Sequence, residues 1–587
     1  MIDPRLAPSP LALFGSRQVV VRGVEEERGR LPSLVWIGRW TASLVRARLR
    51  HALDAQEAGR RVRAFAEHFG GLWVKLGQLV SLRIDLFGVA FCAELAKLQD
   101  LGTGFPGETA IAIAERELGA PIDEAFAWFD PSPIAAASIG QVHRARLHNG
   151  RAVAVKVRRP EIAGRVERQL AVVERVTTLV AWLGVLPQAA WRQFSLELRA
   201  VMREELDYRY EAANIRRMRR TLSRHGIHVP LVYASHSTEC VLTTEFVDGV
   251  PMVEYIKAAG ADPQSAAGWL AENGIDPRRV ARKLALSLLR QIIEDNLFHG
   301  DLHPGNIVLL RDGHVALIDF GTVGSTEREY LEKFRLLSLG LTARDFLKVA
   351  QVTLLMCSSV PPIDLNPVLD DLVRAIQAWT ARTFVPTLPY HQKSLIQIYG
   401  EVAKILIRHG CALQWGFLRI RRAQETLDAS LLVLAPDANP TQVSEDYFVA
   451  AGRRLARRVA RPDMGPRVAA ALSDVEQGAS SLAENTLLQF ELIRRRAQVF
   501  VAHSGRFASA AATMVGWLAL GGGVICAAAV AGWLMPQLFA STRVGTLDVQ
   551  MRLLVLGGAA GCAASLGRLW ARLRQPGVSD SGTGVSI

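Results

Sequence analysis

A polar loop followed by two short strands constrains this chain more than any other feature. The loop is HGDLHPGN, from His299 to Asn306, and an Asp-Gly turn joins the strands of GNIVLLRDGHVALIDFG. Asp301 and Asn306 are five residues apart, and Asp319 follows the second strand. Phosphoryl transfer needs a carboxylate beside the attacking oxygen and hard oxygen donors for Mg²⁺. The pattern therefore predicts a kinase-like loop, with Asp301 as a catalytic residue and Asn306 and Asp319 as magnesium ligands.

A lysine on an upstream strand is the expected contact to phosphate. In AVAVKV, Lys156 stands between valines, where a charge is costly unless it meets an anion. Its partner is expected on the following helices, where EELDYRYEAAN offers Glu205, Asp207 and Glu211. Glu211 is favoured as the ion-pair partner, and Glu205 and Asp207 are expected near the metal and the phosphates. The competing interpretation of these acids is a solvated helix face.

The nucleotide loop should precede Lys156, where a protein kinase would carry GxGxxG. This chain has AAASIGQVH instead. Alanine allows close approach of the backbone to phosphate but is stiffer than glycine. Further along, TTEFVDG has the character of an adenine-binding hinge, so backbone groups from Glu245 to Val247 are expected to contact the base. The residues expected at the phosphates are Ala135, Ala136, Ala137 and Ser138.

Six motifs, in their order and spacing, resemble the UbiB family of atypical kinases. They are KLGQ, PIAAASIGQVH, VAVKV, ELDYRYEAAN, HGDLHPGN and DFG, and they cover about residues 60–324. The resemblance implies an alanine-rich loop in place of the glycine-rich one, and Mg-ATP as the ligand. It implies a helical extension whose KxGQ motif packs over the cleft where a protein substrate would bind. It also implies an ATPase or small-molecule kinase in ubiquinone or related prenyl-quinone biosynthesis at a membrane.

The KxGQ stretch lies in an apolar helical pattern that begins at Val74. A glycine inside a helix costs about 1 kcal/mol relative to alanine. Taken alone, Lys75 would be a surface lysine and Gly77 a helix-packing contact. If the resemblance holds, Lys75 and Gln78 are catalytic residues that point into the nucleotide cleft and meet the acids of ELD. Gly77 would then let this helix approach the cleft closely.

Changes in periodicity divide the chain into regions of an α+β protein. A small strand-rich lobe precedes a large helical lobe, which indicates an atypical protein-kinase-like bilobal fold. The expected regions are a basic helical region at 1–56, the KxGQ extension at 57–130, the small nucleotide-binding lobe at 131–249, the large lobe at 250–500 and a membrane hairpin at 507–570.

The C-terminal part differs in composition from the rest. No charged residue occurs from Phe507 to Thr542, a run longer than the roughly 20 apolar residues that a membrane-spanning helix needs. A second run, LLVLGGAAGCAASLG, is shorter and spans only if its flanking arginines snorkel. Arginines precede and follow the pair, so the positive-inside rule predicts a transmembrane hairpin with both ends in the cytoplasm. The competing interpretation is a hydrophobic hairpin buried on the large lobe.

Composition narrows the range of partners. The chain has 587 residues and a formal net charge of +13, which can indicate nucleic acid, an anionic membrane surface or a phosphorylated ligand. The basic residues are mostly arginines scattered over helical patterns, without a basic block interleaved with aromatics, so no nucleic-acid partner is expected. Six widely spaced cysteines without a CxxC motif argue against a disulfide framework or a zinc site.

The expected function is that of an atypical kinase or ATPase that binds Mg-ATP and supports ubiquinone biosynthesis. The expected location is a bacterial inner membrane, with the catalytic domain facing the cytoplasm. Membrane lipid, prenyl-quinone precursors and quinone-biosynthesis enzymes are the expected partners. Two alternatives stay open: a small-molecule phosphotransferase of the aminoglycoside or choline kinase type, and a lipid-binding scaffold that uses ATP as a switch.

Overall fold

The structure is a computed structural model that describes most of the chain. The described residues are 54–70, 72–83, 87–98, 104–182 and 188–459. Apart from Pro361–Pro367, they fall within one of two compact units, which comprises Met1–Val360 and Val368–Thr486. The sheets and the candidate site described below belong to this unit.

Two expectations concern residues that the structure does not describe. The hairpin expected at 507–570 lies wholly outside the described residues, and so does nearly all of the basic region expected at 1–56. Within the described part of the chain, no helix combines the length and the apolar character needed to cross a membrane. The membrane hairpin stays a prediction.

A four-stranded antiparallel sheet carries Lys156. The strands are in the order β1-β2-β3-β4, and Lys156 lies opposite Leu242 of β4. Side chains alternate between the two faces of a strand. Val155 and Val157 therefore pack with α7 (Gly107–Leu118) in an apolar core on one face, and Lys156 points to the other. The other elements of this region are β1 (Trp128–Ala136), β2 (Gly140–Arg146), β3 (Ala152–Arg158), β4 (Val241–Glu245) and α8 (Ile122–Ala125).

Among the described residues, three α-helices lie between β3 and β4. They are α9 (Ile162–Trp182), α10 (Gln188–Leu206) and α11 (Tyr208–Leu222). The backbone between α10 and α11 is extended at Asp207, with φ −117° and ψ 100°. The Asp207 carboxylate caps α11 by accepting the backbone N–H of Arg209. Because the helix is broken here, acids on the two sides of Asp207 do not follow one continuous helical face.

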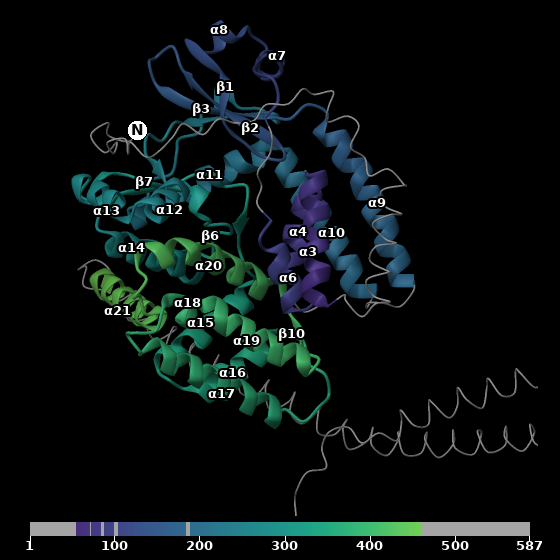
Figure 1. Ribbon diagram of the computed structural model, residues 1–587, viewed down its shortest axis with the longest axis vertical. Helices are drawn as coiled ribbons and strands as arrows, with labels where there is room; N and C mark the ends of the chain where they lie inside the picture. Colours follow the sequence, from purple (N-terminus) through teal and green to yellow (C-terminus); the bar gives the residue numbers. More distant parts are fainter. Residues whose placement is uncertain (1–53, 71, 84–86, 99–103, 183–187, 460–587) are drawn as a thin grey trace, which may run out of the picture. The chain divides into compact units, whose positions relative to one another are not determined.

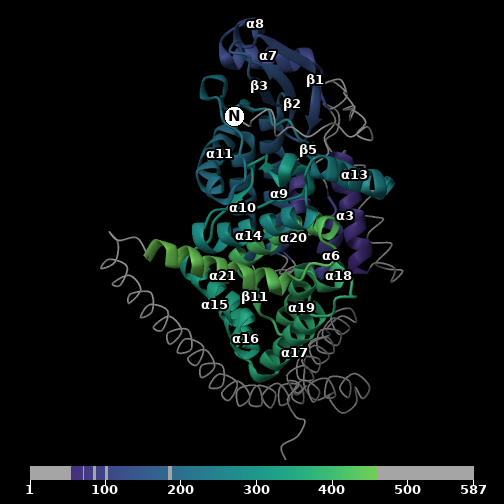
Figure 2. The ribbon, with the colours of Figure 1, turned by 90° about the vertical axis from the view of Figure 1, so that its left-hand side faces the viewer.

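The N-terminal helices α3 (Ala55–Phe69), α4 (Leu72–Leu82) and α6 (Val89–Leu95) pack side by side, as Figure 1 and Figure 2 show. A Cβ atom on Gly77 would lie 2.3 Å from Leu98 Cδ1. The glycine of the KxGQ motif therefore allows close packing inside this helical extension. The expectation that Gly77 serves an approach to the nucleotide cleft is wrong, because its space is taken by Leu98.

The remaining described region is mainly helical and contains a short antiparallel hairpin, β7–β8. Asp312 and Gly313, with φ of +55° and +66°, form the turn that the Asp-Gly pair predicts. The helices are α12 (Met252–Ala261), α13 (Pro263–Glu272), α14 (Pro277–Arg290), α15 (Arg328–Thr342), α16 (Phe346–Leu355), α17 (Asn366–Thr383), α18 (Tyr390–Lys393), α19 (Leu395–Arg408), α20 (Trp415–Leu434) and α21 (Pro440–Val459). The strands are β5 (Val250–Pro251), β6 (Phe298–His299), β7 (Ile307–Leu309), β8 (Val315–Leu317), β9 (Val323–Gly324), β10 (Cys357–Ser359) and β11 (Ala412–Leu413).

The valine- and threonine-rich stretch HVPLVYASHSTECVLTTEFVDG has the composition of a strand pair, but among the described residues it forms one strand, β4. Its first half makes two isolated bridges, His228 to Ala316 and Val232 to Thr244. Pro230 lies between the two bridged residues and has no N–H to donate to a ladder. A continuous strand is therefore interrupted at this point.

Candidate functional site

Lys156 is the centre of the candidate site. Its Nζ lies 2.8 Å from Glu211 Oε2 and 3.9 Å from Asp319 Oδ2. Burial acts to lower the pKa of Lys156, but the charges of Asp319 and Glu211 outweigh it and raise that pKa well above its ordinary value. The lysine is thus held as a cation between two carboxylates. The structure places Glu211 where the sequence predicts it, as the ion-pair partner.

The first turn of α11 holds this pair in place. The ring of Tyr208 is buried and lies 5.2 Å from Lys156 Nζ. Gly140 at the start of β2 leaves room for this ring, because a Cβ there would lie 2.3 Å from the Tyr208 hydroxyl oxygen. Glu211 is on the same helix, and its side chain is only 7% exposed. Tyr208 and Glu211 therefore fix the lysine from one side.

Asp319 combines a strained backbone with an open side chain. Its φ is +63°, in the left-handed region that non-glycine residues seldom adopt. Partial removal from water would by itself raise the pKa of Asp319, but the charge of Lys156, the Gly321 N–H and the charge of Lys75 lower it well below its usual range. The side chain is 51% exposed. Asp319 thus offers an ionised, accessible carboxylate.

The polar loop forms a hydrogen-bonded frame around its aspartate. The backbone N–H of Asp301 donates to Nδ1 of buried His299 at 3.2 Å, and Asn306 Nδ2 donates to the Asp301 carbonyl at 3.0 Å. The Ile318 N–H donates to the Asn306 carbonyl at 3.0 Å, which ties the loop to the segment that carries Asp319. The NH₂ group of Asn306 donates to the loop backbone, so the amide oxygen is the atom that can accept a further hydrogen bond or bind a metal ion.

This donor set fits Mg²⁺. Asn306 and Asp319 supply an amide and a carboxylate oxygen, the hard donors that Mg²⁺ prefers. Among the described residues no group of three or more His, Cys, Asp or Glu side chains is arranged to hold a metal. Mg²⁺ in phosphate sites commonly uses one or two protein ligands and takes the rest from phosphate and water. The arrangement therefore matches a metal held jointly with a nucleotide.

Asp301 also has a partner that the sequence interpretation missed. Oδ2 of Asp301 lies 3.0 Å from an Nη2 of Arg422 on α20. Burial would raise the pKa of Asp301, but Arg422, followed by His303 and Lys75, lowers it below its ordinary value. Because Arg422 lies 121 residues from Asp301 in the chain, no local pattern could have signalled this contact.

The KxGQ helix contributes one of its two predicted residues to this cluster. Lys75 Nζ lies 2.8 Å from Glu205 Oε1, so Lys75 meets an acid of the ELD segment as predicted. Gln78 does not: its amide Nε2 donates to the Leu98 carbonyl at 3.2 Å. The side chain of Gln78 thus secures the chain just after α6, because it lies on the face of α4 that packs within the extension. Lys75, Lys156, Glu205, Glu211 and Asp319 are called the lysine cluster below.

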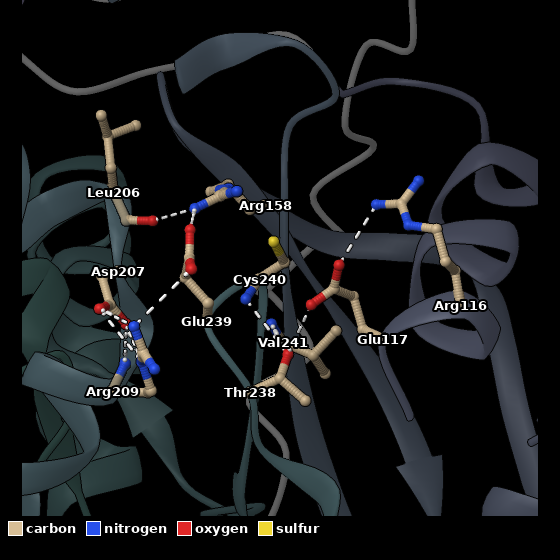
Figure 3. Close-up of polar contacts among 10 residues, drawn as sticks. All are labelled: Arg116, Glu117, Arg158, Leu206, Asp207, Arg209, Thr238, Glu239, Cys240 and Val241. Carbon is tan, nitrogen blue, oxygen red and sulfur yellow. Dashed lines mark hydrogen bonds and ion pairs between the residues drawn. The ribbon is translucent and has the colours of Figure 1, made fainter. Parts of the chain in front are cut away.

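Asp207 belongs to a different group, shown in Figure 3. Its carboxylate pairs with Arg209 at 2.7 Å, and Arg209 also faces Glu239 at 3.7 Å. Arg158 binds Glu239 at 2.9 Å and donates to the Leu206 carbonyl. The expectation that Asp207 lies near metal and phosphates is wrong, because its two oxygens are engaged in capping α11 and pairing with Arg209. Arg158, Asp207, Arg209 and Glu239 are called the junction cluster.

The alanine-rich segment is part of a strand and its turn. Ala135 and Ala136 end β1 and pair with Val142 and Gln141 of β2. The Ala137 N–H donates to the Gly140 carbonyl at 2.8 Å, and the Ala137 carbonyl accepts from Arg159 at 3.2 Å. Ser138 lies in the turn. The segment thus forms the tip of the β1–β2 hairpin, the place where a kinase carries its nucleotide loop.

The expected hinge is only partly free to contact a base. Glu245 donates its N–H to the Leu231 carbonyl, and its buried carboxylate accepts the Leu231 N–H at 3.1 Å and faces His228 at 3.4 Å. The Phe246 N–H donates to the Ala152 carbonyl. Within the described part of the chain, no backbone hydrogen bond engages the Val247 N–H. Val247 therefore fits a contact to the base better than Glu245, whose polar groups have protein partners.

Comparison with known proteins agrees with this geometry. Residues 97–353 match the family described as the ABC1 atypical kinase-like domain. The chain is 32% identical over 415 residues to Protein ACTIVITY OF BC1 COMPLEX KINASE 7, chloroplastic, of Arabidopsis thaliana, covering 70% of this chain and 56% of the relative. It is 33% identical over 315 residues to uncharacterized protein sll0005 of Synechocystis, covering 53% of this chain and 44% of the relative. The chain therefore spans about half the length of these curated relatives.

Fold and site together define a kinase-like protein of mixed helix and strand content. The chain carries an ABC1 atypical kinase-like domain, the domain of the UbiB-type ABC1 family to which these relatives belong, as its motifs predict. A solved structure, the complex of Rv3197 with erythromycin from Mycobacterium tuberculosis, aligns with 70% of this chain and 98% of that chain. The TM-score is 0.39 and the identity 24%, and so distant a likeness carries no functional argument.

Proposed function

We propose that this protein binds Mg-ATP and acts as an ATP-dependent phosphotransferase or ATPase that supports ubiquinone or related prenyl-quinone biosynthesis at a membrane. One observation carries the catalytic part of the proposal. Lys156 is paired with Glu211 at 2.8 Å and lies 3.9 Å from Asp319, which follows the short hairpin after the loop of Asp301 and Asn306. Phosphoryl transfer depends on positioning and on charge stabilisation, and this set supplies both.

Each residue has a distinct task in this proposal. Lys156, oriented by Glu211, binds the phosphates of the nucleotide. Asn306 and Asp319 hold Mg²⁺, which neutralises charge on the phosphates when it is bound. Asp301 accepts the proton of the attacking hydroxyl or water. Val247 and the tip of the β1–β2 hairpin bind the base and the phosphates.

The link to quinones and to a membrane rests on family membership and on the apolar C-terminal sequence. Burial of roughly 20 apolar residues in lipid is strongly favourable, and quinones with prenyl tails are themselves lipid-soluble. A membrane anchor would bring the ATP site to such substrates. The quinone and precursor profile of cells that lack this protein tests this part: an unchanged profile contradicts it.

The catalytic part is tested with Asp319→Asn. Loss of the charge weakens metal binding, and the half-exposed side chain leaves no cavity when it is replaced. We expect ATP turnover to fall roughly a hundredfold or more, while the protein stays folded. Asp207→Asn is the matched control, because it removes the same charge from the junction cluster. Hydrolysis by Asp319→Asn at the parental rate would show that the metal assignment is wrong.

A further inference from the structure

The contact between Asp301 and Arg422 is specific to one carboxylate oxygen. Arg422 donates to Oδ2 at 3.0 Å. Within the described part of the chain, no hydrogen bond engages Oδ1, and the Asp301 side chain is 23% exposed. One oxygen is therefore held by a fixed cation while the other stays open to an incoming proton. This is the arrangement that a general base needs.

Arg422 is held in place by the packing of α20. Leu418, Ile420 and Ala423, which flank it on this helix, are almost fully buried. The helix lies against α14 (Figure 1). It also contacts the short 3₁₀ turn that contains Asn306. Arg83, just after α4, lies over the ring of Trp415 at the start of α20. The position of the guanidinium is thus set by the core of the large helical region and by the KxGQ extension.

Arg422 lies outside residues 97–353, which match the ABC1 domain. The other charged or titratable groups that act on Asp301 are His303 of the same loop, Lys75 of α4 and His299, whose Nδ1 accepts the Asp301 N–H. Lys75 has its own acid, Glu205, at 2.8 Å. Among the described residues, Arg422 is the cation that forms an ion pair with Asp301, and its planar group keeps its charge at all relevant pH values.

We propose that Arg422 is the positioning residue for Asp301, and that the catalytic loop of the ABC1 domain depends on this arginine from a helix beyond the domain. Arg422 keeps Oδ2 engaged so that Oδ1 faces the attacking hydroxyl or water. The proposal rests on the proposed function, in which Asp301 accepts that proton. In this proposal α20 is needed for catalysis, because it carries the arginine that positions the general base. Misplacement of a base by about 1 Å can lower the rate about a hundredfold.

The test measures steady-state ATP turnover by the full-length protein. We expect Arg422→Gln to lower kcat roughly tenfold to a hundredfold, with KM for Mg-ATP unchanged, because the residue acts on Asp301 and not on the nucleotide. Arg422→Lys should restore most of the activity, since a single hydrogen bond does not require the forked group. Arg421→Gln is the matched control: it removes a neighbouring charge whose partner, at 2.6 Å, is Glu425. Melting temperatures check that every variant folds.

A double-mutant cycle with Asp301→Asn separates positioning from a merely structural role. If Arg422 acts through Asp301, adding Arg422→Gln to Asp301→Asn causes no further loss of kcat. The proposal is overturned if the double variant loses kcat by the product of the two single losses, or if Arg422→Gln keeps the parental kcat. It is also overturned if Arg422→Gln turns over ATP faster than the parent, because Arg422 would then be blocking Asp301. Absence of ATP turnover in the wild-type protein would overturn the proposed function itself, whereas turnover that is insensitive to Arg422 overturns only this inference.

Discussion

Two ionic clusters lie next to each other in this protein, and both draw on the short segment EELDYRYE. The lysine cluster takes Glu205 and Glu211, and the junction cluster takes Asp207 and Arg209. Glu211 is only 7% exposed, whereas Arg209 is 67% exposed. The same short segment therefore supplies acids to a partly buried site and to a solvent-exposed ion-pair cluster.

The difference shows that burial and partner choice decide what a charged residue does. Coulomb energies between charges are several-fold larger in partly buried surroundings than in bulk water. Lys156 holds its charge because Glu211 and Asp319 oppose the cost of burial. Exposed pairs such as Arg209 with Glu239 contribute little energy. Removal of a charge should thus affect the lysine cluster far more than the junction cluster.

The largest effect is expected from Glu211→Gln. Lys156 loses its 2.8 Å partner and stays partly buried, with only Asp319 at 3.9 Å left to balance its charge. Breaking such a pair costs about 3 kcal/mol of unfolding free energy, and misplacement of the lysine should lower kcat/KM for ATP roughly a hundredfold. Chemical denaturation and steady-state kinetics measure both quantities. Glu239→Gln in the junction cluster is the control, and equal losses in the two variants would refute the contrast between the clusters.

An intermediate effect is expected from Lys75→Met. The variant removes a positive charge that acts on Asp301 and Asp319 and leaves Glu205 unpaired. The site becomes more negative, so Mg²⁺ should bind more tightly and ATP more weakly. A change of about threefold in each is in line with a screened interaction near the surface. Turnover measured against Mg²⁺ and against ATP gives both constants, and Arg209→Met should change neither. A rise in the Mg²⁺ requirement would contradict the electrostatic role of Lys75.

The smallest effect on activity is expected from Asp207→Ala. This change removes the cap of α11 and the pair with Arg209, which should lower the unfolding free energy by about 1 kcal/mol. ATP turnover should stay within about twofold of the parent, because the carboxylate does not reach the lysine cluster. A fall in turnover comparable to that of Asp319→Asn would show that Asp207 does act at the metal site.

The sequence alone determined the parts of the site that are local in the chain. Asp301 and Asn306 lie in one tight loop. Asp319 follows a two-strand hairpin, and the Asp-Gly pair in the sequence predicts its turn. Alternation along β3 placed Lys156 away from the apolar face, because the side-chain period of a strand is two. The loop, the hairpin turn and the strand alternation depend on backbone propensities that act over a few residues, so they can be recognised from the residue types and their spacing.

Tertiary structure decided which residues meet across long distances. Helical periodicity alone would have kept Asp207 and Glu211, which are four residues apart, on one face. The break at Asp207 instead places these two acids in different clusters. Gly77 and Gln78 face Leu98 because α4 packs within its own extension. Arg422 reaches Asp301 only because α20 packs against the catalytic loop. Such contacts depend on how buried surfaces fit together, and no local pattern in the chain encodes that fit.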